Sequence, residues 1–248
     1  MRGARARRRW PLWRTGLFLL GLVAILAALA SPIDGLALQL FSVHMVQHML
    51  LLTVAPPLLL LGAPVRPLLR GLPAALRRTV IRAIARNTAF RALVHLARRP
   101  LVAGALYVGG LYAWHVPALY DAAVDDGTIH VLEHTWFLVT ALLFWSVVID
   151  PAPFSATLPY AARIPFLLLV GAAQNTILGG LLAFSDRPFY APYLRTTSAF
   201  GLDAAADQRL GGAIMWVPGD LIFLIAASAS FFLWLQSEEQ AQRLRESR

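Results

Sequence analysis

The stretch SVHMVQHMLLLTVAPPLLLLGAP at residues 42–64 combines a long apolar run with polar side chains at its start. Its length is close to the roughly 20 residues that an α-helix needs to cross about 30 Å of hydrocarbon. Two histidines, His44 and His48, lie one helical turn apart in its first turns. Ionisable side chains are costly inside a membrane and are usually functional there. The stretch therefore predicts a membrane-spanning helix with a functional site near one end.

The composition of the whole chain supports the same fold class. Of its 248 residues, 58% are hydrophobic and only 14% are charged, which is too apolar for an ordinary soluble domain. Alternating strand patterns of about ten residues are absent, which argues against an outer-membrane barrel. We predict one all-α membrane domain, residues 1–248, a polytopic helix bundle with about six transmembrane helices. The predicted spans are 13–30, 40–62, 100–118, 130–149, 163–184 and 212–235.

The arginines predict how the bundle is oriented. All 22 basic residues are arginine, and 19 of them fall in the two tails, in the 63–99 loop and before the fifth span. Only Arg187, Arg195 and Arg209 fall on the other side. Because positively charged loops stay in the cytoplasm, both termini are expected to be cytoplasmic, in the plasma (inner) membrane of a bacterium.

Two segments outside the spans carry further expectations. Residues 74–96 mix apolar positions with an arginine row, which predicts an amphipathic helix on the cytoplasmic surface, facing anionic lipid. A nucleic-acid partner is not expected, since no aromatic side chains interleave with these arginines. The first 30 residues resemble a signal peptide, but Pro32 and the length of the apolar run favour a retained helix over a cleaved one.

The predicted orientation brings most histidines to one leaflet. Two pairs with i, i+4 spacing, His44/His48 and His130/His134, each share a helix face near the outer side, and His115 ends the third span there. The sixth, His95, falls on the inner side and is expected to have no special task. The five outer imidazoles therefore predict one metal or haem site in the outer leaflet.

Residues beside these histidines are further candidate ligands, and each also has a structural interpretation. Glu133 is a candidate ligand, with two alternatives: it orients a histidine, or it favours the helix start. Met45, Met49 and Met215 are auxiliary ligands if the ion is copper(I), and otherwise packing residues. The chain has no cysteine, so thiolate and iron–sulfur sites are excluded. Among bare metals copper is favoured, with zinc as the alternative.

Four motifs then carry a resemblance to a known family. Four runs resemble the CtaG family, cytochrome c oxidase assembly factors of the caa(3) type. They are the run at 42–64, WHVPALYDAA (114–123), HVLEHTWFLVTALLFWSVVIDP (130–151) and DQRLGGAIMWVPGDLIFL (207–224). The resemblance covers about residues 31–235. Members often have seven spans, against six predicted here. The family histidines correspond to His44, His48, His115, His130 and His134.

The resemblance implies a role in maturing a haem–copper oxidase. Together with the histidines, it predicts an assembly factor, not an enzyme, that delivers copper to the catalytic subunit of the oxidase. Its expected partners are that subunit and the lipid bilayer, with a second copy of the chain as a further candidate. Three other functions stay open from the residues alone. These are a haem-binding electron-transfer protein, a metal-dependent hydroxylase or hydrolase with Glu133 as general base, and a copper or small-solute transporter.

Overall fold

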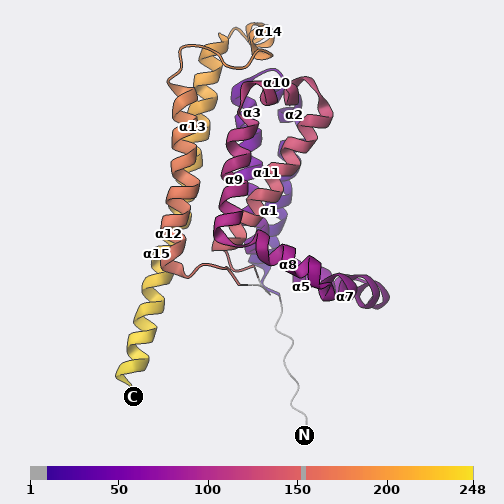
Figure 1. The fold of residues 1–248 in the computed structure, drawn as a ribbon, viewed down its shortest axis with the longest axis vertical. Coiled ribbons are helices and arrows are strands. Elements are labelled where there is room, and N and C mark those ends of the chain that lie inside the picture. The colour runs from indigo at the N-terminus through magenta and orange to yellow at the C-terminus, as the bar shows by residue number, and fades with distance from the viewer. Residues whose placement is uncertain (1–9, 152–154, 248) are drawn as a thin grey trace.

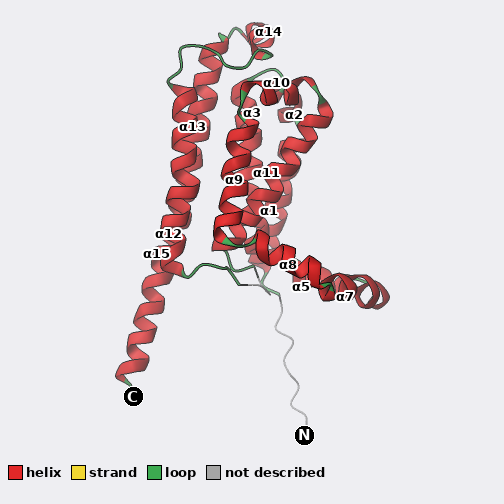
Figure 2. Ribbon diagram, viewed as in Figure 1, coloured by secondary structure: helices red, strands yellow, loops and turns green. Residues whose placement is uncertain are grey.

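Helices make up all the regular structure that the computed structural model describes, which covers residues 10–151 and 155–247 (Figures 1 and 2). This confirms the predicted all-α class. The arginines at residues 2–9, which were used to predict the orientation, lie outside the described ranges. So does most of the charged part of the segment that resembles a signal peptide. Within the described ranges, five helical segments are long and apolar enough to cross a membrane, and a bent pair supplies a sixth if it counts as one span.

The candidate spans follow one another along the chain, with long connections between the second and third spans and between the fifth and sixth. Two of them, the second and the fifth, contain a π-helical stretch (η), and the helix of the last span continues beyond its apolar region. In chain order they are α1 (Leu12–Leu29); α3 (Phe41–Met49) with η1 (Leu50–Val54) and α4 (Ala55–Gly62); the bent pair α9 (Pro100–Trp114) and α10 (Pro117–Asp125); α11 (Gly127–Val148); α12 (Tyr160–Phe166) with η3 (Leu167–Ala172) and α13 (Ala173–Ala183); and α15 (Ala204–Glu246).

The two ends of the bundle differ in what they carry (Figure 1). One end, called here the histidine end, holds the short helices α2 (Pro32–Ala37), α10 and α14 (Tyr193–Thr196). The other, called the arginine end, holds the C-terminus and a projecting arm that includes α5 (Val65–Gly71), α7 (Arg82–Arg86) and α8 (Thr88–Ala97). The arm belongs to the loop in which nine of the arginines fall.

The third span is shorter than the predicted 100–118. Its helix α9 ends at Trp114, and α10 leaves at 76° to it. Pro117 explains the break, because a proline disfavours helical geometry in the residue before it and donates no backbone hydrogen bond. Val116 accordingly has extended backbone angles. The bend turns the chain across the histidine end instead of out of the bundle.

The predicted amphipathic helix at 74–96 is helical but is not one helix. It divides into α6 (Ala74–Leu76), η2 (Arg77–Ile81), α7 and α8, with a break at Asn87. The Asn87 side chain accepts a hydrogen bond from Phe90 N at 2.9 Å, which starts a new helix in place of continuing the old one. Leu93 is 62% exposed, so apolar side chains on the arm are left without protein neighbours.

The proline pair in the second span has a structural consequence deep in the core. Pro56 has no N–H, so it leaves the Leu52 carbonyl without its ordinary helical partner. The Trp145 indole Nε1 of α11 donates to that carbonyl at 2.9 Å. The Trp145 ring also stacks on Phe223 of α15, with ring centroids 5.4 Å apart. One buried tryptophan thus joins η1, α11 and α15 near the end of α11 that lies away from the histidines.

Helices α13 and α15 pack at close range through glycines. A Cβ added at Gly212 would lie 2.5 Å from Ala183 N, and one at Gly179 would lie 2.9 Å from Gly212 O. Only hydrogen fits at these positions, so the two backbones approach closely. The contact fixes the first half of α15 beside the bundle. That half carries side chains that reach the histidine-bearing helix α3.

Candidate metal centre

The structure brings together all five histidines that the sequence predicted to converge. His44 and His48 come from α3, His115 follows the end of α9, and His130 and His134 lie on the first turns of α11. Ring centroids are 4.3 Å apart for His44–His48, 4.1 Å for His130–His134 and 5.2 Å for His44–His130. His115 joins them through His48, at 5.9 Å. Three helices therefore supply one imidazole cluster.

Glu133 lies inside this cluster and not beside it. Its side chain is fully buried, with Oε2 3.8 Å from His44 Nε2 and Oε1 3.5 Å from His48 Nε2. Donor atoms of His44, His130, Glu133 and His134 all lie within 4.8 Å of one another. Metal–nitrogen bonds of about 2.0–2.1 Å place ligand atoms up to about 4 Å apart across a metal, so these side chains would need to close in slightly to ligate a single ion.

Many polar atoms of the cluster lack hydrogen-bond partners in the part of the chain that the structure describes. The Nε2 atom of each of the five histidines is buried and unpartnered, as are both carboxylate oxygens of Glu133. A buried polar group without a partner costs free energy, and native structures contain few of them. One carboxylate cannot satisfy five imidazoles. The group has the composition of a ligand set that a cation would complete.

Hydrogen bonds to His115 fix which of its nitrogens is free. Its Nδ1 lies 2.7 Å from the Leu111 carbonyl oxygen. A carbonyl can only accept, so Nδ1 carries the hydrogen and donates it. In the neutral ring Nε2 then has its lone pair free. A second hydrogen bond of this kind orients metal-binding histidines in proteins generally.

Two tyrosines perform the same task for His44. The hydroxyls of Tyr120 on α10 and Tyr193 on α14 each lie 2.7 Å from His44 Nδ1. Tyr193 donates its own hydrogen to the Ala37 carbonyl at 2.9 Å, so its oxygen is available to accept from Nδ1. This arrangement places the hydrogen on Nδ1 and leaves Nε2 of His44 free toward Glu133.

The segment that contains Tyr193 closes the histidine end. Tyr190 donates to the His115 carbonyl at 3.1 Å and packs against Tyr120, with ring centroids 4.0 Å apart. Burial raises the pKa of the Tyr190 and Tyr193 hydroxyls, so both remain protonated donors at neutral pH. Sequence reasoning did not identify these tyrosines. They lie in a loop and a short helix, where no periodicity reveals which side chains face inward.

A carboxylate from α15 holds the helix that carries His44 and His48. Asp207 is 1% exposed, and it accepts hydrogen bonds from Phe41 N at 2.6 Å, Ser42 N at 3.2 Å and Ser42 Oγ at 2.5 Å. The first N–H groups of α3 have no partner within their own helix. Asp207 therefore acts as a helix cap supplied from a distant part of the chain, and it sets where α3 begins.

Comparison with known proteins identifies the family. The chain matches the family of cytochrome c oxidase caa3 assembly factors, Caa3_CtaG, over residues 1–237. The chain belongs to this family. The match spans the complete histidine cluster and all the candidate spans except the end of α15.

Three curated relatives of this member of the Caa3_CtaG family have the same sequence identity to it. Uncharacterized proteins of Mycobacterium leprae, Mycobacterium bovis and Mycobacterium tuberculosis are each 31% identical to it, over 96–97% of the chain. The chain spans only 37% of the length of each of these relatives. No solved structure matches.

The remaining predicted residues of this Caa3_CtaG chain have other surroundings. Met45, Met49 and Met215 all belong to the hydrophobic core. Met45 and Met49 pack against glycines of α15, with Met45 Cγ 3.1 Å from where a Cβ of Gly211 would lie. These contacts match the packing alternative. His95 lies exposed on α8, on the arm at the arginine end.

Proposed function

We propose that this protein binds a copper ion through its buried imidazole cluster and passes it to the catalytic subunit of cytochrome c oxidase. The observation that carries the proposal is a set of buried donor atoms without hydrogen-bond partners among the described residues, namely five imidazole Nε2 atoms and two Glu133 oxygens. Within this set, donor atoms of His44, His130, Glu133 and His134 lie within 4.8 Å of one another. Membership in a family of oxidase assembly factors supplies the destination. Copper is the cargo of this step, and the protein itself is not an enzyme.

The chemistry of the donor set favours copper among the candidate ions. Imidazole nitrogens bind copper and zinc well, whereas magnesium and calcium prefer oxygen ligands. Among first-row divalent ions, copper binds a given nitrogen site more tightly than zinc does. A set with more imidazoles than one ion needs also suits transfer, because the ion can exchange one ligand for another without leaving the site.

The proposed location follows from the arginine distribution. If the arginine end is cytoplasmic, the histidine end lies in the outer leaflet of the bacterial plasma membrane. Delivery into a membrane-embedded oxidase requires a donor that holds its ion within the membrane, as a cluster on α3, α9 and α11 would. Contact with the oxidase subunit is accordingly proposed on the outer half of the bundle.

The packing of the imidazoles argues against the haem alternative. Ligation of a haem by two axial histidines requires the porphyrin plane to fit between the two imidazoles. Here the imidazole rings lie directly against one another, with centroids of 4.1–5.2 Å between three of the pairs. An absorption spectrum of the purified protein checks this point. A strong Soret band would overturn the copper proposal.

A genetic experiment tests delivery. A strain that lacks the gene is complemented with the wild type, with His130→Ala or with His95→Ala, which is the same change on the exposed arm. Copper content and activity of cytochrome c oxidase are then measured in isolated membranes. We expect His130→Ala to leave oxidase poor in copper and low in activity, and His95→Ala to behave as wild type. Full copper loading with His130→Ala at equal protein level would contradict the proposal.

A further inference from the structure

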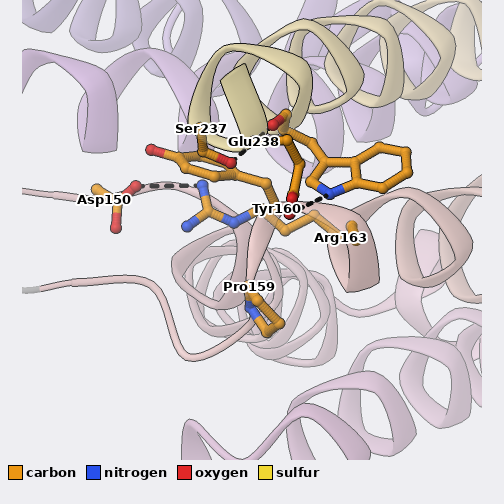
Figure 3. Close-up of a pocket in the computed structure, with 8 residues that line it drawn as sticks. Asp150, Pro159, Tyr160, Arg163, Ser237 and Glu238 are labelled. Carbon is orange, nitrogen blue, oxygen red and sulfur yellow. Dashed lines mark hydrogen bonds and ion pairs between the residues drawn. The ribbon is translucent and has the colours of Figure 1, made fainter. Parts of the chain in front are cut away.

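Two adjoining cavities lie at the arginine end, far from the imidazole cluster. The first, called here the polar chamber, has a volume of about 480 Å³ and lies between α12, α15 and the segment after α11 (Figure 3). The second, called the apolar chamber, has a volume of about 360 Å³ and is lined by side chains of α4, α11, α12 with η3, and α15. Asp150 and Arg163 line both. Each volume falls in the range of about 300–1,000 Å³ that ligand pockets have.

The two chambers lie at different depths in the membrane, which correspond to the headgroup and the acyl chains of a lipid. Walls of the apolar chamber come from candidate spans and include Leu61, Val148 and Ile225. The polar chamber has Tyr160 and Trp234 in its wall, beside Ser237. Tyrosine and tryptophan are enriched where a membrane meets water. The polar chamber therefore lies at headgroup depth, and the apolar chamber opens from it into the hydrocarbon.

A fixed cation stands where the two chambers meet. Arg163 is 6% exposed, donates Nε to the Leu158 carbonyl at 2.9 Å and Nη1 to Asp150 at 3.1 Å, and lies 4.2 Å over the Tyr160 ring (Figure 3). Its second terminal nitrogen, Nη2, makes no hydrogen bond to the described residues. A guanidinium held in this way suits a phosphate, because its planar donors match phosphate oxygens.

Two carboxylates accompany that single cation. Asp150 is 45% exposed on its side chain, and Glu238 on α15 accepts from the Trp234 indole at 3.3 Å. Figure 3 shows Asp150 facing the Arg163 guanidinium, with Ser237 and Glu238 contributed by α15. The chamber thus carries a net negative charge. A headgroup with a phosphate and a primary ammonium complements it better than an anionic headgroup does.

We propose that the two chambers form a binding site for phosphatidylethanolamine. The phosphate lies beside Arg163, the ammonium donates hydrogen bonds to Asp150 and Glu238, and one acyl chain occupies the apolar chamber. The bound lipid fills the space between α15 and the α4–α11 side of the bundle. It is separate from the imidazole cluster and does not depend on the copper proposal.

Lipid analysis of the purified protein tests this site. The full chain is reconstituted into nanodiscs of equal parts phosphatidylethanolamine, phosphatidylglycerol and phosphatidylcholine with matched acyl chains, and the lipids retained after detergent extraction are measured by native mass spectrometry. We expect phosphatidylethanolamine to be retained at least about 10-fold over the other two, since charge-assisted hydrogen bonds of about 1.5–3 kcal/mol favour it. Retention in equal proportions, or preference for either other lipid, would overturn the proposal.

Variants locate the effect. Arg163→Gln is expected to lower retained phosphatidylethanolamine by about 10-fold or more, because the loss of one charge-assisted contact is of that size. Arg243→Gln, the same change on the exposed end of α15, serves as its control and is expected to match wild type. If Arg163→Gln does not fold, the double variant Asp150→Asn/Glu238→Gln decides. It should shift retention toward phosphatidylglycerol, and unchanged selectivity would overturn the assignment.

Discussion

Asp207→Asn is the substitution that best tests how the histidine cluster is held in place. The wild-type carboxylate accepts two backbone N–H groups and one hydroxyl at the start of α3. Asparagine retains one acceptor and presents an amide N–H₂ to donors that need an acceptor. The change therefore leaves at least one buried N–H of Phe41 or Ser42 unsatisfied.

The magnitude follows from the bonds lost. Each hydrogen bond to a charged group contributes about 1.5–3 kcal/mol, and an N-cap contributes about 1 kcal/mol. Relief of the buried charge offsets part of this loss, so we expect Asp207→Asn to lower stability by roughly 2–4 kcal/mol. Because α3 carries His44 and His48, copper affinity should fall by roughly 10–100-fold, as for other residues that orient metal ligands.

The assay is competition for copper against a chromophoric chelator, together with thermal unfolding in the same detergent. Asp203→Asn is the matched control. Asp203 also caps a helix at the histidine end, but the hydrogen bond that its side chain accepts comes from Ala206 N of its own helix, α15. Copper affinity of Asp207→Asn equal to that of Asp203→Asn would refute the idea that Asp207 positions the site.

Three further substitutions test other parts of the account. Trp145→Phe removes the donor to the carbonyl freed by the proline pair, so thermal unfolding should show a loss of about 1–3 kcal/mol; an unchanged midpoint would count against that bond. Tyr193→Phe removes a hydroxyl bonded to His44 Nδ1 and should weaken copper binding by at least about 10-fold in the chelator assay, whereas wild-type affinity would argue that the phenol has no orienting role. Gly179→Ala should destabilise the α13–α15 contact. Gly180→Ala is its control, because a Cβ there has no atom within 4 Å, and it should be neutral or stabilise the helix by up to about 1 kcal/mol. Equal unfolding midpoints for the two variants would contradict the close approach of the helices.

The centre of the histidine cluster could be predicted because helical periodicity carries that information. The i, i+4 spacing of His44/His48 and of His130/His134 places each pair on one face, and the alternation of spans brings both faces to the same end. Glu133 was predicted as an auxiliary residue because it stands next to His134 in the first turns of the same span. The structure places it between the two pairs, with a carboxylate oxygen 3.5 Å from His48 Nε2.

The parts that were missed depend on tertiary contacts over long separations in sequence. Asp207 lies 166 residues from Phe41, and nothing in the sequence of either helix marks the pair. Tyr193 reaches His44 across 149 residues from a short helix without a repeating pattern. The third span was drawn too long because its apolar composition continues past Trp114, while Pro117 ends the helical geometry. The apolar composition of the third span predicted that it lies in the membrane, but the backbone restriction imposed by Pro117 determines where its helix ends.

The most direct test of the proposed copper site is the copper content of the purified protein. Wild type, the His44/His48/His130/His134 alanine variant and His95→Ala are expressed with copper, purified identically and measured for bound copper per chain, with zinc measured in the same samples. The account predicts copper in the wild type and in His95→Ala, and a loss of nearly all of it in the fourfold variant. Equal copper in all three proteins, or zinc in place of copper in the wild type, would contradict it.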